Sequence, residues 1–127
     1  DTLEEGVAFL EENGRKENVI TTESGLQYEV VTLGDGPMPT EASTVSVFYE
    51  GTLLDGTVFD SSYETGDTVS FPLNGVIPGW TEGLQLMPVG STYKFYIPSN
   101  LAYGSRSTGP IPANSTLIFK VELLEVK

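Results

Sequence analysis

Residues 71–90 read FPLNGVIPGWTEGLQLMPVG, and this stretch interrupts a chain that otherwise alternates like β-strands. Four apolar residues of the stretch recur at helical spacing: Ile77, Trp80, Leu84 and Met87. Pro78 stands where a helix can begin, and Pro88 and Gly90 are typical of a helix end. The stretch therefore predicts one short helix.

The segments on both sides of this helix have the period of two that is typical of strands. Apolar and polar residues alternate in residues 26–31, 44–54, 69–73, 93–97 and 117–123. Asp55-Gly56 is a hairpin signal. We expect an α+β fold, with a curved antiparallel sheet of five to six strands wrapped around the helix.

The N-terminal part of the chain is different. Residues 3–17 look like an acidic helix with a thin apolar stripe, and residues 18–25 look like a linker. A helix this short and acidic is marginal alone, so it fits the end of a longer helix that begins upstream. We expect residues 1–20 to form a helical segment and linker that projects from a domain at 21–127, and to be removable with little loss of activity.

Composition excludes several classes of function. The 127 residues contain no cysteine and no histidine, so thiol chemistry, zinc fingers and Ser-His-Asp catalysis are impossible. The net charge of −12 disfavours nucleic acids and anionic membranes as partners. No apolar run approaches the ~18 residues of a membrane span, so we expect no membrane insertion.

Six aromatic residues lie near predicted turns: Tyr49, Phe59, Phe71, Trp80, Tyr103 and Phe119. By composition they read first as plain core. Tyr49, Trp80 and Tyr103, however, each carry a polar atom that needs a partner when buried. Aromatic side chains around a few polar groups also describe a small-ligand pocket, so the residues alone leave both interpretations open.

Several short motifs occur together in a fixed order: residues 47–51 (VFYEG), 55–62 (DGTVFDSS), 76–80 (VIPGW), 83–84 (GL), 101–104 (LAYG), 111–112 (IP) and 117–124 (LIFKVELL). In this order the chain resembles the FKBP-type peptidyl-prolyl cis-trans isomerases over about residues 24–127. Residues 71–85, residues 24–28 and the acidic helix resemble the bacterial macrophage-infectivity-potentiator-like branch. The resemblance implies an enzyme that assists protein folding and needs no cofactor or metal.

The resemblance also implies roles for ten residues. The catalytic set would be Tyr49, Phe59, Asp60, Trp80, Tyr103 and Phe119, with Trp80 as the floor beneath the proline ring. The substrate-binding set would be Phe71, Val76, Ile77 and Ile111, with the Ile77 backbone N–H donating to a ligand carbonyl. Two positions depart from the family pattern: Thr65 stands where an arginine usually supports Asp60, and Ser107 stands near a histidine of some relatives.

The implied partners are X-Pro segments of unfolded or partly folded proteins and the macrolide inhibitors tacrolimus and rapamycin. In this branch an upstream helical region makes a homodimer, so a homodimer formed outside this chain is expected. The bacterial periplasm or cell envelope is the expected location, and the cytoplasm is the alternative.

Three other interpretations remain. A binding module could grip proline segments or unfolded chains with chaperone activity and little catalysis. The number of acidic residues would suit a carboxylate-paired hydrolase, but the acids cluster in the N-terminal segment and in turns rather than around the aromatic residues. Asp55, Asp60, Glu64 and Asp67 lie near one another in the sequence, as in a calcium site, but they lack EF-hand spacing.

Overall fold

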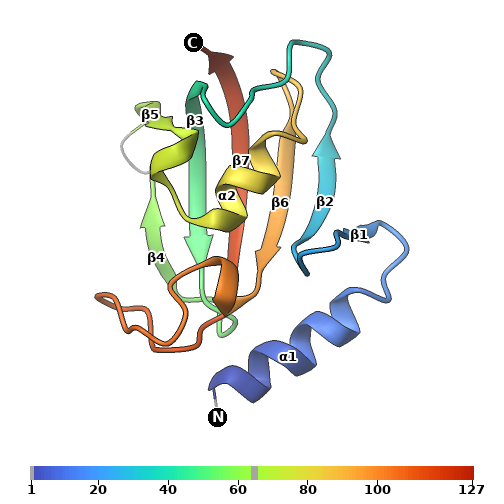
Figure 1. Ribbon diagram of the computed structural model, residues 1–127, viewed down its shortest axis with the longest axis vertical. Helices are drawn as coiled ribbons and strands as arrows, with labels where there is room; N and C mark the ends of the chain where they lie inside the picture. Colours follow the sequence, from blue (N-terminus) through green and yellow to red (C-terminus); the bar gives the residue numbers. More distant parts are fainter. Residues whose placement is uncertain (1, 64–65) are drawn as a thin grey trace.

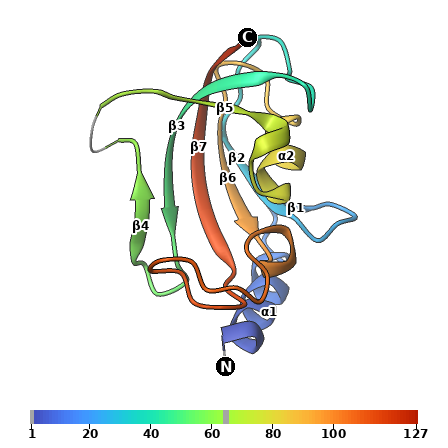
Figure 2. The same ribbon diagram turned by 60° about the vertical axis from the view of Figure 1, so that its left-hand side comes forward.

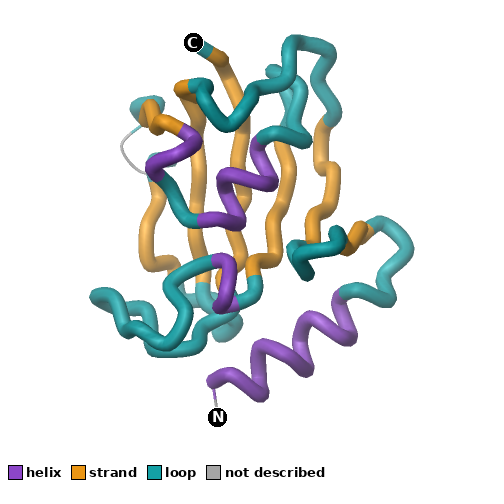
Figure 3. The backbone as a smooth tube through the Cα atoms, viewed as in Figure 1, coloured by secondary structure: helices purple, strands orange, loops and turns teal. Residues whose placement is uncertain are grey.

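The fold is built on one antiparallel sheet (Figures 1 and 3). The computed structural model describes residues 2–63 and 66–127. The strands are β1 (Val19–Thr21), β2 (Gln27–Thr32), β3 (Thr44–Thr52), β4 (Val58–Ser61), β5 (Val69–Pro72), β6 (Thr92–Ile97) and β7 (Leu117–Val126). Their order is β1-β2-β6-β7-β3-β4, with β5 also paired to β3. The predicted α+β class is confirmed, but the sheet has 7 strands rather than five or six. Two strands are absent from the alternating segments: β1 lies in the segment expected to be a linker, and β4 follows the predicted hairpin turn at Asp55-Gly56.

The C-terminal strand β7 lies inside the sheet, between β6 and β3. Its alternating residues Leu117, Phe119, Val121 and Leu123 are buried. Each of these side chains faces the core because successive strand residues point to opposite faces. The last strand of the chain is therefore a central strand of the sheet.

The helix α2 (Pro78–Leu84) crosses the concave face of the sheet, as Figure 2 shows. Trp80 and Leu84 are buried on its inner side. Gly83 allows the close approach, because a Cβ atom there would lie 2.6 Å from Cε1 of Phe95. The helix ends at Leu84, earlier than the spacing predicts, although Met87 is still buried.

The helix α1 (Thr2–Asn13) packs on the domain instead of projecting from it. The buried Asn13 donates a hydrogen bond from Nδ2 to Oε1 of Gln27 (2.8 Å), and Gln27 donates from Nε2 to the Leu10 carbonyl (2.7 Å). The rings of Phe9 and Tyr96 lie 5.8 Å apart. The helix ends four residues before the predicted end at 17, and residue 20, the predicted division, falls within β1.

Candidate functional site

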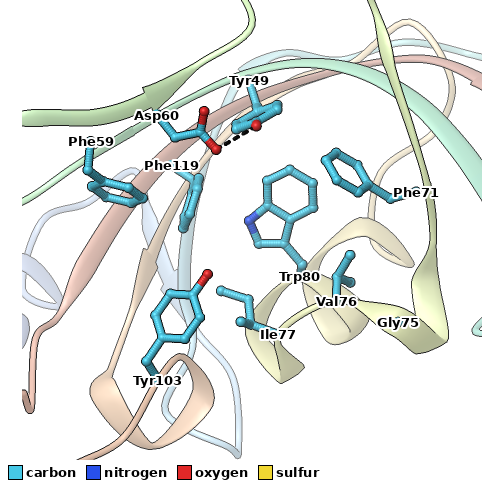
Figure 4. A pocket seen from close by; sticks show the side chains of 10 residues that line it. All are labelled: Tyr49, Phe59, Asp60, Phe71, Gly75, Val76, Ile77, Trp80, Tyr103 and Phe119. Atoms are coloured by element: carbon cyan, nitrogen blue, oxygen red, sulfur yellow. Dashed lines mark hydrogen bonds between the residues drawn. The ribbon is translucent and has the colours of Figure 1, made fainter. Parts of the chain in front are cut away.

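A cavity of about 430 Å³ opens on the concave side of the sheet (Figure 4). It is lined by Tyr49, Phe59, Asp60, Phe71, Gly75, Val76, Ile77, Trp80, Tyr103 and Phe119. Nine of the ten residues singled out in the sequence are in this set. The lining residues come from β3, β4, β5, β7 and α2, from the single turn η1 (Leu73–Gly75) and the connection after it, and from the segment that follows the single turn η2 (Ser99–Leu101). A volume of this size is typical of small-ligand sites.

The indole of Trp80 forms the centre of an aromatic enclosure. Three rings stand nearly perpendicular to it, each with its centroid 5.3 Å from that of Trp80: Tyr49 at 83°, Phe71 at 83° and Phe119 at 85°. Edge-to-face pairs of this kind are favoured by the ring quadrupoles. The enclosure therefore holds the indole in one orientation.

One polar atom of the enclosure has no conventional partner. Nε1 of Trp80 is buried and has no hydrogen-bond partner among the described residues. Figure 4 shows this nitrogen on the side of the indole that faces Phe119. The perpendicular ring pair fits an N–H···π contact with Phe119, which is a weak but recurrent substitute for a hydrogen bond.

The side wall of the cavity depends on a glycine in β3. Gly51 pairs in register with Phe119 on β7 and with Asp60 on β4. A Cβ atom on Gly51 would lie 2.5 Å from Cζ of Phe59 and 2.7 Å from Cε1 of Phe119. The two phenyl rings, 5.5 Å apart and perpendicular, therefore close over the bare backbone of Gly51.

For the isomerase activity that the resemblance implies, we expect Gly51→Ala to displace the Phe59 ring outward and to weaken binding of a proline peptide about tenfold, or ~1.4 kcal/mol. KM for that peptide should rise more than kcat falls, because Trp80 keeps its place. The double variant Gly51→Ala/Phe59→Leu should recover only part of the affinity, since the shorter side chain relieves the contact with residue 59 and leaves the 2.7 Å contact with Phe119. Unchanged binding in Gly51→Ala would contradict this role.

Asp60 is tied to the floor of the cavity through a tyrosine. The Tyr49 hydroxyl donates to Oδ2 of Asp60 at 2.6 Å, drawn as a dashed line in Figure 4. Burial, and then this hydrogen bond to a carboxylate, raise the pKa of Tyr49, so its hydroxyl stays protonated. Tyr49 therefore orients the Asp60 carboxylate. Thr65, which stands where the family usually has an arginine, lies outside the described residues.

The mouth of the cavity is held by the connection between η1 and α2. The Thr81 hydroxyl donates to the Leu73 carbonyl at 2.6 Å and so ties the helix to the preceding turn. Val76 and Ile77 lie between these two anchors, and Pro78 begins the helix at its first position. Their placement at the mouth is thus a consequence of local hydrogen bonding.

Ile111 is the one predicted site residue that does not line the cavity. It is buried in the core and exchanges two backbone hydrogen bonds of 2.9 Å with Thr108, which closes the tip of the loop after Tyr103. Gly75, in contrast, lines the cavity although it is not among the predicted site residues. A glycine contributes only backbone there, so no side-chain pattern marks it.

The acidic residues considered for a calcium site do not gather into a ligand cluster in the part of the chain that the structure describes. In residues 2–63 and 66–127, no three acidic side chains come together as ligands, and Glu64 lies outside that part of the chain. Asp55 instead accepts a hydrogen bond from the Thr57 backbone N–H at 2.9 Å and so stabilises the turn between β3 and β4.

Comparison with known proteins agrees with this geometry. Residues 36–124 match the family described as FKBP-type peptidyl-prolyl cis-trans isomerase, and residues 1–30 match the domain amino terminal to it. The chain is 56% identical over 127 residues to FkpA, an FKBP-type peptidyl-prolyl cis-trans isomerase of Aeromonas hydrophila, covering 100% of this chain and 47% of that protein. It is 52% identical over 123 residues to the outer membrane protein MIP of Legionella longbeachae, covering 96% of this chain and 53% of that protein.

Solved structures give the same result. The crystal structure of FkpA from Escherichia coli superposes with a TM-score of 0.96 at 48% identity, covering 100% of this chain and 60% of that one. A peptidyl-prolyl cis-trans isomerase from Pseudomonas syringae superposes with a TM-score of 0.93 at 35% identity, covering 99% and 93%. The chain spans about half the length of the curated relatives it matches. In motif order, fold and pocket, this chain belongs to the FKBP-type peptidyl-prolyl cis-trans isomerases.

Proposed function

We propose that the chain catalyses cis–trans isomerisation of X-Pro peptide bonds and so assists protein folding. The observation that carries the proposal is the aromatic enclosure, in which three rings stand edge-on around the Trp80 indole and few polar groups reach the cavity. Such a site takes a compact apolar ring. Proline is the residue whose ring is joined to an amide of nearly balanced isomers.

The reaction needs no proton transfer and no bond cleavage. Rotation about the amide bond has a barrier of roughly 18–20 kcal/mol, because resonance across C–N is lost at the transition state. The twisted amide is less polar than the planar forms, so a dry aromatic pocket binds it better than water does. Lowering the barrier by ~5 kcal/mol accelerates the reaction on the order of 10³–10⁴-fold.

The lining residues divide this work. In the proposal, the proline ring lies over Trp80, with Tyr49, Phe71 and Phe119 around it. The Ile77 backbone N–H donates to the carbonyl that follows proline. Asp60, oriented by Tyr49, and the Tyr103 hydroxyl at the rim supply the polar contacts to the rotating amide.

Exchange NMR spectroscopy on an unstructured peptide with an apolar residue before proline tests the proposal. We expect catalysed cis–trans exchange at micromolar protein that survives a chelator. A peptide with alanine in place of proline serves as the control for non-specific line broadening. Binding without acceleration would instead support the second candidate, a module that grips proline segments or unfolded chains with little catalysis.

Tacrolimus and rapamycin are the proposed inhibitors, since the same enclosure accepts a ring of proline's size. Tacrolimus should change the fluorescence of Trp80, which is the single tryptophan of the chain, and should displace the peptide. Calorimetry gives the affinity independently. No change in emission together with no heat of binding would rule out Trp80 as the floor of the ligand site.

Catalysis should depend little on pH between about 6 and 9, because the mechanism uses no general acid or base. Tyr49 stays neutral across this range, since its pKa is raised in the folded state. The measurement is kcat/KM for one peptide across the range, with circular dichroism to follow the fold. A bell-shaped profile would mean that a titrating group takes part.

Stability, in contrast, should fall above pH 10. Burial and Glu29 raise the pKa of Tyr96 to about 12, so Tyr96 keeps its proton after the unfolded chain has lost its own. A raised pKa stabilises the folded state fully below the unfolded value and stops doing so as the pH rises toward the folded value. Thermal melts between pH 9 and 12 should show this decline, and Tyr96→Phe should reduce it.

The longer protein is proposed to act in the bacterial cell envelope as a homodimer joined by an upstream helical region. Two observations support this: a relative of 52% identity is named an outer membrane protein, and the match at residues 1–30 is to a domain that precedes the isomerase. Among the described residues, no helix has the length and apolar character needed to cross a membrane. Sedimentation of the longer protein and of this chain would locate the dimer contacts.

A further inference from the structure

One edge of the sheet is only partly covered. β2 is the outer neighbour of β6, and β1 pairs with β2 only from Val19↔Glu29 to Thr21↔Gln27. Figure 1 shows β1 lying at the lower end of β2, with the upper part of β2 open on its outer side. Beyond Leu33 the chain is tied inward again, because the Gly34 N–H donates to Oγ of Ser91 at 2.8 Å. Within residues 2–63 and 66–127, no strand pairs with the outer side of β2 beyond Glu29. Residues 30–33, the end of β2 and the residue that follows it, therefore form a free edge, about 13 Å long at the usual rise of a strand.

This free edge is apolar. Val30, Val31 and Leu33 are 39%, 53% and 67% exposed. Protein edges usually carry lysine, proline or inward-pointing charge that blocks pairing with another chain. Residues 30–33 (VVTL) contain none of these. A register shift between Val30 and Thr32 twists the edge, which limits an added strand to a few residues and hence to modest affinity.

The charged residues near the free edge indicate which kind of segment would bind there. The sequence has no lysine or arginine between Lys16 and Lys94. Glu23 and Asp35 are exposed on the segments that flank β2, whereas Glu17, before β1, stands beside the exposed bases Arg15 and Lys16. Lys94, the base that is nearest in the sheet, is opposed by Glu29 in the register of β2 and β6. The surroundings therefore favour a cationic partner.

A second copy of the chain fits poorly here. Each copy has a net charge of −12, and pairing of two β2 edges would bring the same acidic flanks together. An extended segment that alternates apolar and basic side chains meets both requirements: it adds main-chain hydrogen bonds to the edge and opposite charge to the flanks.

We propose that residues 30–33 are a second client-binding surface, which captures an extended cationic segment of an unfolded chain by β-strand addition. The surface is distinct from the isomerase pocket, because β6 and β7 separate β2 from β3 in the sheet. It goes beyond X-Pro isomerisation and does not depend on it. A proline-free segment should bind there, since each added proline removes a main-chain donor.

The test uses the full chain, labelled with ¹⁵N, and a proline-free octapeptide of alternating valine and lysine. We expect peptide-dependent shifts at residues 30–33 and slower amide exchange there. A peptide with N-methylated alternate residues should lose about tenfold in affinity, and a valine–glutamate peptide should not bind. Shifts confined to the pocket residues, or no loss on N-methylation, would overturn the proposal.

Two variants of equal charge change separate the edge from general attraction. Val31→Lys should weaken peptide binding about fivefold or more, and Val7→Lys, on α1 and 51% exposed, should change it less than twofold. Equal losses would overturn the proposal in favour of non-specific electrostatics. Shifts at residues 30–33 that grow with protein concentration alone would assign the edge to a second copy instead. Folding of both variants is checked by circular dichroism, and the N-methylated peptide tests the wild-type chain without any substitution.

Discussion

Trp80→Ala should lower kcat/KM for a proline peptide by at least about a hundredfold, or ~2.7 kcal/mol. The indole is the surface against which Tyr49, Phe71 and Phe119 are set edge-on. Its loss removes the floor of the cavity and the reason for the orientation of these rings. Large-to-small changes of this kind also cost ~3–5 kcal/mol of stability, so activity is measured at low temperature on the folded fraction.

Leu84→Ala is the matched control for this experiment. Leu84 is fully buried on the same helix, does not line the cavity, and its truncation costs a similar ~2–5 kcal/mol. The control should keep kcat/KM within about threefold of the wild type in its folded fraction. Equal activity losses in the two variants would assign the effect to stability and would contradict the role proposed for the indole.

Removal of residues 1–16 should lower the unfolding free energy by about 2–3 kcal/mol and the Tm by roughly 10 °C, with kcat/KM at low temperature unchanged. The deletion leaves β1 intact but takes away Asn13, which is buried against Gln27, and Phe9, which contacts Tyr96. No residue that lines the pocket lies in the deleted segment. Calorimetry and exchange spectroscopy on the shortened chain provide the two measurements.

A pair of asparagines tests the same interface in the full chain. Asn13→Ala should cost ~1–3 kcal/mol, because it leaves Oε1 of the buried Gln27 without its donor. Asn18→Ala should cost at most about 0.5 kcal/mol, since the hydrogen bond of Asn18 to Glu29 is exposed.

For the deletion of residues 1–16, a Tm equal to that of the full chain would mean that α1 does not stabilise the domain.

The elements with clear periodicity were predictable from the sequence. The spacing of Ile77, Trp80 and Leu84 predicts α2, and the alternation of apolar and polar residues predicts the longer strands. Both patterns arise because one face of a helix or strand packs against the core. The site residues were named through the family resemblance rather than through spacing. The pocket then assembles nine of those ten residues from segments that the sequence pattern does not connect.

The features that were missed lack such a pattern. β1 has three residues in a polar segment and exists because β2 offers it an edge. The packing of α1 depends on a hydrogen bond between the side-chain amides of Asn13 and Gln27. Nothing in the sequence pattern distinguishes these two polar residues from exposed ones. Gly51 and Gly75 act by having no side chain. Ile111 has the position expected for the flanking loop, but its side chain turns into the core.

The central position of β7 has a consequence for synthesis of the protein. The ribosome releases β7 last among the strands, yet β7 joins the half-sheet of β1, β2 and β6 to the half formed by β3, β4 and β5. Neither half has a covered inner edge until residues 117–126 have left the exit tunnel. The domain therefore folds only after its translation is complete, and until then its unpaired strands are exposed to chaperones and to other nascent chains.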